Sequence, residues 1–457
     1  MSLFLRRLLP ACVVTATLMA CVTSPPVQRP AMDLPEHFKE QGPWKVAQPK
    51  DTASRGHWWS IYHDPVLNGL EEKISVSNQS LASAAAKVAQ AKALTQAARA
   101  AYFPTLDGTV SNLRGQAGRN MPLTTDAGLL DLSWEADLWG RIRNNVSASQ
   151  ANAEAVAADL ESTRLSLQAQ LAQSYLALRI VDAQKHLLDG EIESYAKSLK
   201  LTENRKAGGI AASKDVAQAR TILATTKAES IDTEVQRTQL EHAIAMLIGV
   251  PPAAFSLPIR NDKITVPAIP RSGTSAWLER RPDIAAAERR VASANKLIGV
   301  AKAAFFPTLA FTATGGFRGV KDLVSAPNRF WSLGPALAGP LFDGGLRKAQ
   351  LDQAKGAYDQ NVADYRQAVL TGLQQVEDNL SALRVLERES TVQDEAVKAA
   401  RESETVALNE YKAGTADYLN VITAQTAALT NELTALNVLN RRLAASVLLV
   451  KALGGGW

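Results

Sequence analysis

The chain has 457 residues, of which 46% are hydrophobic and 21% are charged, and its formal net charge is +5. This composition supplies enough apolar side chains for a core, and its abundance of Ala, Leu, Gln and charged residues favours helices. A small net charge without a basic block argues against nucleic acid as a partner.

The first residues have the layout of a secretory signal. Arg6 and Arg7 precede an apolar segment, residues 8–20, that is too short to span a bilayer. It ends in Leu-Met-Ala-Cys, which resembles the lipobox of bacterial lipoproteins. We therefore expect residues 1–20 to be a signal peptide and Cys21 to carry lipid; a plain signal peptide with an incidental cysteine is the alternative. Cys12, the other cysteine, lies in the segment that is removed, which leaves no internal disulfide.

Residues 21–64 are expected to form an extended, acylated N-terminal segment. Helical patterning then runs from Pro65 to about Tyr102. It stops at Pro104, because a proline ring blocks the helix and favours an extended conformation at Phe103.

Segments with strand-like alternation follow. We predict strands at about 104–116 and 128–139, and again at about 307–318 and 329–342. Their length and pattern are typical of outer-membrane β-barrels. Four strands cannot close a barrel, and an open edge is excluded from lipid, so we predict a trimer with twelve strands. On the second strand we expect three acidic residues to face water in the lumen and to favour cations: Asp131, Glu135 and Asp137.

The long helical stretches carry apolar residues at alternating steps of four and three. This period predicts left-handed supercoiling, and two such seams on one helix indicate a neighbour on each side. A helix from about Ile142 to Asn204 would extend about 95 Å, as a tube crossing a gap between membranes requires. The most apolar run, residues 443–450, has only eight residues, so we expect no transmembrane helix and a membrane crossing by strands alone.

The chain repeats itself at an offset of about 203 residues. Residues 97–106 read AARAAYFPTL, and residues 300–309 read VAKAAFFPTL. The repeat predicts two similar halves, 65–250 and 282–457, joined by a Pro-rich linker at 251–281.

No enzyme motif stands out: there is no P-loop, no GxGxxG after a strand, no HExxH and no Cys/His cluster. We therefore expect no catalysis, no cofactor and no metal.

The chain resembles the outer-membrane efflux duct family, in its acylated lipoprotein branch. The resemblance rests on six motifs in order: Trp58-Trp59 with Asp64-Pro65, Asp137-Leu138-Trp139-Gly140-Arg141, Glu279-Arg280-Arg281-Pro282-Asp283-Ile284, Ala304-Phe305-Phe306-Pro307, Leu341-Phe342-Asp343-Gly344-Gly345 and Leu453-Gly454-Gly455-Gly456-Trp457. It implies a mixed α and β membrane protein, a trimeric twelve-stranded β-barrel continued by a long periplasmic α-helical barrel. The implied partners are a periplasmic adaptor and an inner-membrane pump, expected to be proton-driven, and the implied role is passive export of drugs or other small toxic compounds.

The resemblance also implies a periplasmic aperture at the turns between long helices, residues 206–216 and 411–423. Asp215 and Tyr411 match family positions that hold the helices shut. Ala416 and Thr423 stand where family members carry a basic and an acidic residue, which argues against a charged latch. We expect a constriction of Tyr418, Leu419 and Asn420 with Asp417 nearby; ordinary packing between helices is the alternative reading. The alternative functions are a periplasmic helical structural or adaptor lipoprotein and an enzyme on an α+β fold.

Overall fold

The computed structural model describes residues 56–116, 122–262, 264–268, 280–320 and 324–455. By internal contacts the chain divides into two units. The first contains Ala85–Asp159 and Asp283–Ala368; the second contains the described chain before Ala85, Leu160–Pro282 and the chain from Val369. The elements in order are η1 (Trp58–Tyr62), α2 (Pro65–Ser77), α3 (Gln79–Ala100), β1 (Thr105–Gly115), β2 (Leu123–Ala136), α4 (Arg141–Ala207), α5 (Ser213–Leu247), η2 (Pro252–Ala254), α7 (Pro282–Ala303), β3 (Thr308–Gly319), η3 (Ala326–Asn328), β4 (Arg329–Ala338), α8 (Leu346–Ala413) and α9 (Tyr418–Ala452).

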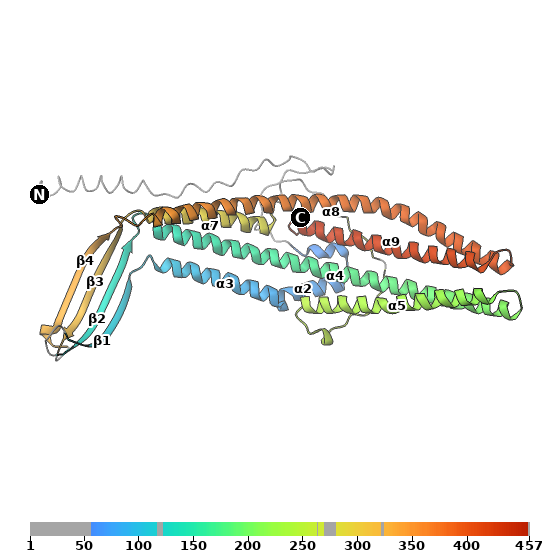
Figure 1. Ribbon diagram of the computed structural model, residues 1–457, viewed down its shortest axis with the longest axis horizontal. Helices are drawn as coiled ribbons and strands as arrows, with labels where there is room; N and C mark the ends of the chain where they lie inside the picture. Colours follow the sequence, from blue (N-terminus) through green and yellow to red (C-terminus); the bar gives the residue numbers. More distant parts are fainter. Residues whose placement is uncertain (1–55, 117–121, 263, 269–279, 321–323, 456–457) are drawn as a thin grey trace. The chain divides into compact units, whose positions relative to one another are not determined.

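The first unit contains one four-stranded antiparallel sheet in the order β1-β2-β3-β4 (Figure 1). β1 and β3 each begin directly after a proline, at Thr105 and Thr308. β2 begins at Leu123, earlier than the expected 128, because residues 123–127 continue the pairing with 111–115. The loop between β1 and β2 is correspondingly shorter than expected.

Aromatic side chains pack together at the junctions between helices and strands. The Trp139 indole stacks on Phe306 with ring centroids 4.7 Å apart, and its Nε1 donates to the Pro307 carbonyl at 2.7 Å. The Trp134 indole donates to the Tyr102 carbonyl at 2.9 Å and stacks on Phe311. These contacts connect residues from the two halves of the sequence within the sheet unit.

The long helices are continuous. α4 has 67 residues and α8 has 68, so each extends about 100 Å at 1.5 Å per residue. The expected helix from Pro65 to Tyr102 is interrupted at Asn78, whose side chain donates to the Leu247 carbonyl at 2.6 Å and accepts from the Leu81 amide at 2.9 Å. The helix is interrupted because Asn78 packs against the end of α5, and the residues around Asn78 give no sign of this distant contact.

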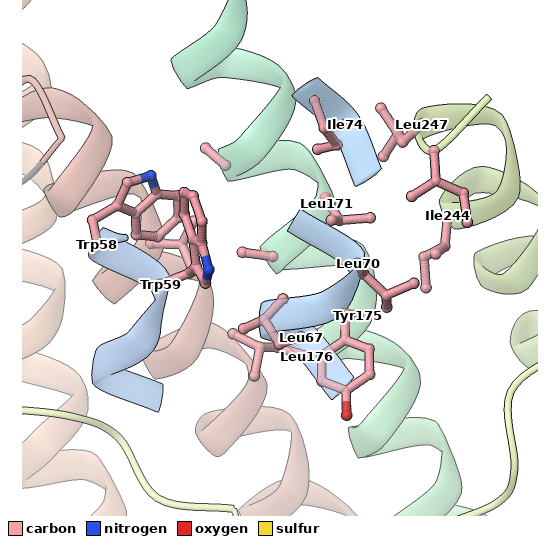
Figure 2. Packing of buried hydrophobic residues seen from close by; sticks show 14 of the residues in the cluster. Trp58, Trp59, Leu67, Leu70, Ile74, Leu171, Tyr175, Leu176, Ile244 and Leu247 are labelled. Carbon is pink, nitrogen blue, oxygen red and sulfur yellow. The ribbon is translucent and has the colours of Figure 1, made fainter. Parts of the chain in front are cut away.

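The main apolar core lies in the second unit. Trp58, Trp59, Leu67, Tyr175 and Leu247 are among its buried members, contributed by η1, α2, α4 and α5 (Figure 2). By length and composition alone, α9 is apolar enough to cross a membrane, although the sequence led us to expect no such helix. Three of its apolar residues belong to this core, Leu443, Val447 and Val450, so packing within the protein accounts for them.

A polar cluster fixes the start of α2 to α4 and to the linker. Asp64 caps α2 by accepting from the Val66 and Leu67 amides, and it also accepts from the Tyr175 hydroxyl at 2.7 Å. Arg179, 4% exposed, and Arg260 of the linker both pair with the same carboxylate. Burial alone would raise the pKa of Asp64, but its hydrogen bonds and the charge of Arg260 together lower that pKa.

Candidate functional site

The turn between α4 and α5 is held by its own backbone and by one carboxylate. Gly209 adopts a positive φ of 74°, which favours glycine. The Ile210 amide donates to the Arg205 carbonyl at 2.8 Å. Asp215 accepts from the Ala212 amide at 3.1 Å and so caps the first turn of α5. The structure therefore gives half-buried Asp215 a local role within its own turn.

The turn between α8 and α9 is built in a similar way. Gly414 has a φ of 81°, and the Thr415 amide donates to the Glu410 carbonyl at 3.0 Å. Arg205 connects the two turns, because its Nη1 donates to the Lys412 carbonyl at 3.0 Å and its guanidinium lies 4.7 Å from the centre of the Tyr411 ring. This cation–π contact joins α4 to α8 without an opposite charge.

The expected aperture residues divide into buried and exposed sets. Tyr418 is 1% exposed and packs edge-on against Tyr411, with centroids 5.1 Å apart. Its hydroxyl lies 3.1 Å from Ser198 Oγ, and burial raises its pKa. Tyr418 therefore faces the interior of the chain and does not offer its ring to solvent, contrary to its expected place in the constriction. The sequence could not show that Tyr418 is buried and the adjacent Leu419 is exposed, because the neighbouring helices determine which face of α9 is buried.

The exposed set lies on the other side of the α9 N-terminus. Leu419 is 56% exposed, and Asn420 and Asp417 are also exposed. Thr423 is exposed and its hydroxyl donates to the Leu419 carbonyl at 2.9 Å, within the same helix. Of the residues expected at the aperture, Leu419, Asn420, Asp417 and Thr423 are therefore the exposed ones.

A charged cluster not identified from the sequence lies farther along the same helices. The Arg401 guanidinium pairs with Glu191 at 2.6 Å, with Glu404 at 2.7 Å and with Glu432. It thereby connects α8 with α4 and α9. Burial raises the pKa of Glu404, and neighbouring Glu191 and Glu432 act in the same direction. The only local signal is the spacing of Arg401 and Glu404 by three residues; the other two partners are distant in sequence.

The register separates the sheet into two chemically different faces. Directly paired residues share a face, so the pairing places Asp131 with Asp107 and Thr314, and Ser133 with Thr105 and Thr312. The opposite face is mainly apolar; it carries Leu106, Val110, Leu130, Leu132, Trp134, Leu309, Phe311, Phe317, Trp331, Leu333 and Leu337.

The three expected lumen carboxylates have different positions. Asp131 lies on the polar face and accepts from the Thr314 hydroxyl at 2.6 Å. Glu135 lies on the same face, and both its oxygens accept from Arg141. The position of Asp137 differs from the expectation, because β2 ends at Ala136 and Asp137 caps α4 by accepting from the Ile142 and Arg143 amides, each at 2.9 Å. A helix cap satisfies that carboxylate better than a strand position would.

Cys21 lies outside the described residues. Among the residues that the structure describes, no group of three or more His, Cys, Asp and Glu side chains is arranged to hold a metal ion.

Comparison with known proteins gives a consistent result over nearly the whole chain. The family model described as "Outer membrane efflux protein" matches residues 71–250 and 274–455. The probable efflux pump outer membrane protein TtgC of Pseudomonas putida is 29% identical, with 99% of this chain and 96% of that protein covered. The cation efflux system protein CusC of Escherichia coli is 27% identical, with 99% of each covered. The solved structure of the outer-membrane channel OprN superposes with a TM-score of 0.86 at 29% identity, with 96% of this chain and 100% of that chain covered.

Proposed function

Because this chain belongs to the outer membrane efflux protein family and is the outer-membrane channel of an efflux pump, we propose that three copies assemble into one passive duct. The observation that carries the proposal is the sheet: within the part of the chain that the structure describes, β1 pairs only with β2 and β4 only with β3, so each outer strand has an unpaired edge. An unpaired edge cannot be exposed to lipid. Pairing β1 of one copy with β4 of the next closes a barrel of twelve strands.

The two faces of the sheet support this assembly. In a closed barrel the apolar face contacts lipid and the face with Asp131, Ser133 and Thr314 lines a water-filled passage. Since Arg141 neutralises Glu135, the cation preference of the passage would come from Asp131 and Asp107. That is a smaller acidic set than three carboxylates per copy.

The test is the size and activity of the purified assembly. Full-length protein extracted in detergent is expected to have the mass of three copies and to conduct ions in a planar bilayer. A monomer that conducts would refute the closure by three copies. A protein extractable without detergent would favour the alternative function, a periplasmic structural or adaptor lipoprotein.

Channels of this family work in tripartite pumps with an adaptor and an inner-membrane pump. We infer a proton-driven pump and small toxic compounds as cargo. The names of the relatives support export but state different cargoes. Pseudomonas putida has an antibiotic efflux pump outer membrane protein, ArpC, and a toluene efflux pump outer membrane protein, whereas CusC belongs to a cation efflux system. We therefore expect the duct itself to have no strong substrate preference and, as a channel of this family, to act without catalysis. Loss of the gene should raise sensitivity to several unrelated compounds, and sensitivity to none would contradict this role.

We place the aperture at the start of α9. Leu419 and Asn420 project from this helix into solvent, while Tyr411 and Tyr418 pack beneath them and Arg205 holds the two turns together. Packing and the contacts of Arg205 with the Tyr411 ring and the Lys412 carbonyl, which include no pair of opposite charges, would then keep the passage narrow, with less dependence on ionic strength than a salt bridge has. Asp215 caps the first turn of α5, and Asp417 and Thr423 are exposed at the start of α9.

Single-channel conductance tests this placement. Leu419→Ser is expected to raise conductance, because it removes apolar bulk from the narrowest point. Ile231→Ser is the matched control, since Ile231 is an exposed aliphatic residue, 65% exposed, on α5 away from the turns. Equal conductance for wild type and Leu419→Ser would place the closure elsewhere.

A further inference from the structure

The end of the sheet where the helices begin carries an unusual combination of exposed apolar and basic side chains. The pairs Thr105–Ser133 and Thr308–Ala338 put the starts of β1 and β3 and the ends of β2 and β4 along one edge. Exposed apolar residues surround this edge: Phe103 is 70% exposed and Phe342 is 91% exposed. In outer-membrane barrels, girdles of aromatic residues flank the apolar band at both interfaces.

Six basic residues lie within about two helical turns of this edge. Three of them are neutralised within the chain: Arg141 pairs with Glu135, Arg143 with Asp137 and Arg347 with Asp343. These pairs fix the entry of β2 into α4 and of β4 into α8. The carboxylates of Glu135, Asp137 and Asp343 at this edge are therefore already paired with a basic residue of the same chain.

The other three are Arg99, Lys302 and Lys348. Among the described residues no hydrogen bond or ion pair involves their side chains; Arg99 and Lys348 are exposed, and Lys302 is half-buried. Arg99 and Lys302 occupy the same place in the two halves, since each stands five residues before the proline that directly precedes a strand. In each half a cation therefore lies one helical turn from an exposed aromatic residue, Phe103 in the first and Phe305 in the second.

We propose that Arg99, Lys302 and Lys348 bind the phosphate groups of anionic phospholipids in the periplasmic leaflet of the outer membrane. Long basic side chains can extend from an apolar surface to the headgroup level, and each basic residue near an anionic surface adds to the attraction. The occupant is a lipid because the cations continue an apolar surface. A free phosphate would gain nothing from Phe103 and Phe342. This inference rests on the outer-membrane location and not on the number of copies in the barrel.

The experiment compares full-length protein in phosphatidylethanolamine nanodiscs with and without phosphatidylglycerol. Retained lipids are counted by native mass spectrometry and thermal unfolding is recorded. The triple variant Arg99→Gln, Lys302→Gln, Lys348→Gln is expected to lose the preference for phosphatidylglycerol, by up to about fivefold for each residue removed. The charge-keeping variant Arg99→Lys, Lys302→Arg, Lys348→Arg should retain it. Soluble glycerol phosphate should not compete.

The matched control removes three exposed lysines of the second unit, in Lys214→Gln, Lys227→Gln, Lys398→Gln. It makes the same change in charge and should leave the lipid preference intact. An unchanged preference in the first triple variant, or an equal loss in the control, overturns the proposal. Single variants at Arg99 and Lys302 answer the same question if the triple variant does not fold. Failure of every form to enter nanodiscs would instead contradict the membrane location itself.

Discussion

Because of Glu71 in α2, the folded protein should become less stable as the pH rises. Its side chain is fully buried, and neither carboxylate oxygen has a hydrogen-bond partner among the described residues. Burial alone raises its pKa from 4.5 to about 9. A carboxyl group in this position is held in its protonated form, because an unpaired buried charge is costly.

The pKa shift sets both the sign and the size of the effect. Below about pH 4.5 the group is protonated in the folded and unfolded chains, so it has no effect on pH dependence. Above this value the unfolded chain loses the proton and the folded chain keeps it, so stability falls until about pH 9. At about pH 7.5 the difference of roughly three pH units corresponds to about 4 kcal/mol as an upper bound, at 1.36 kcal/mol per unit.

Glu71→Gln keeps the shape of the side chain and removes its titration. We expect it to unfold at a higher temperature than the wild type, with a difference that grows from pH 5 to pH 9. Thermal unfolding of the detergent-solubilised protein, followed by circular dichroism at several pH values, measures this. Glu72→Gln is the matched control, since Glu72 is the next residue on the same helix and is exposed. A wild type and a Glu71→Gln variant with parallel pH profiles would refute the reasoning.

Three further predictions follow from single positions. Cysteines at 132 and 135 should react oppositely with a water-soluble thiol reagent in membranes, because β2 places them on different faces; strong labelling at Leu132 alone would reverse the assignment of the faces. Gly249→Ala should lower stability by at least about 2 kcal/mol in chemical denaturation, because φ is 70° and a Cβ would lie 2.1 Å from a carbonyl oxygen at the end of α2; Gly356→Ala, in open space on α8, should not lower it. Cys21→Ser should yield protein whose intact mass lacks acyl groups, whereas a wild type without lipid would disprove the lipobox reading.

Much of the fold could be predicted from local patterns. The Phe-Pro steps at Pro104 and Pro307 locate the change from helix to strand, because proline acts on its own neighbours regardless of the rest of the chain. The alternation in β2 also assigns Leu132 and Asp131 to opposite faces, since successive strand residues point in opposite directions. Positions of this kind need no knowledge of distant residues.

Elsewhere the local pattern extended too far or was incomplete. The alternation continues through Asp137, but that residue instead caps α4, because the free amides at a helix start compete for its carboxylate. The helical pattern continues through Asn78, which stops α2 by bonding to Leu247 at the end of α5. Each difference arises where a side chain has a partner that the pattern does not include.

The sequence by itself determined most of the helices and strands, the two-faced character of the strands and the family motifs, because these depend on residues a few positions apart. Only the tertiary structure decided that Tyr418 is buried against Tyr411 while Leu419 is exposed, and that Arg401 collects carboxylates from three helices. Burial and ion pairing depend on which helix faces lie together. That choice is made by the packing of the whole chain, so no short stretch of sequence contains it.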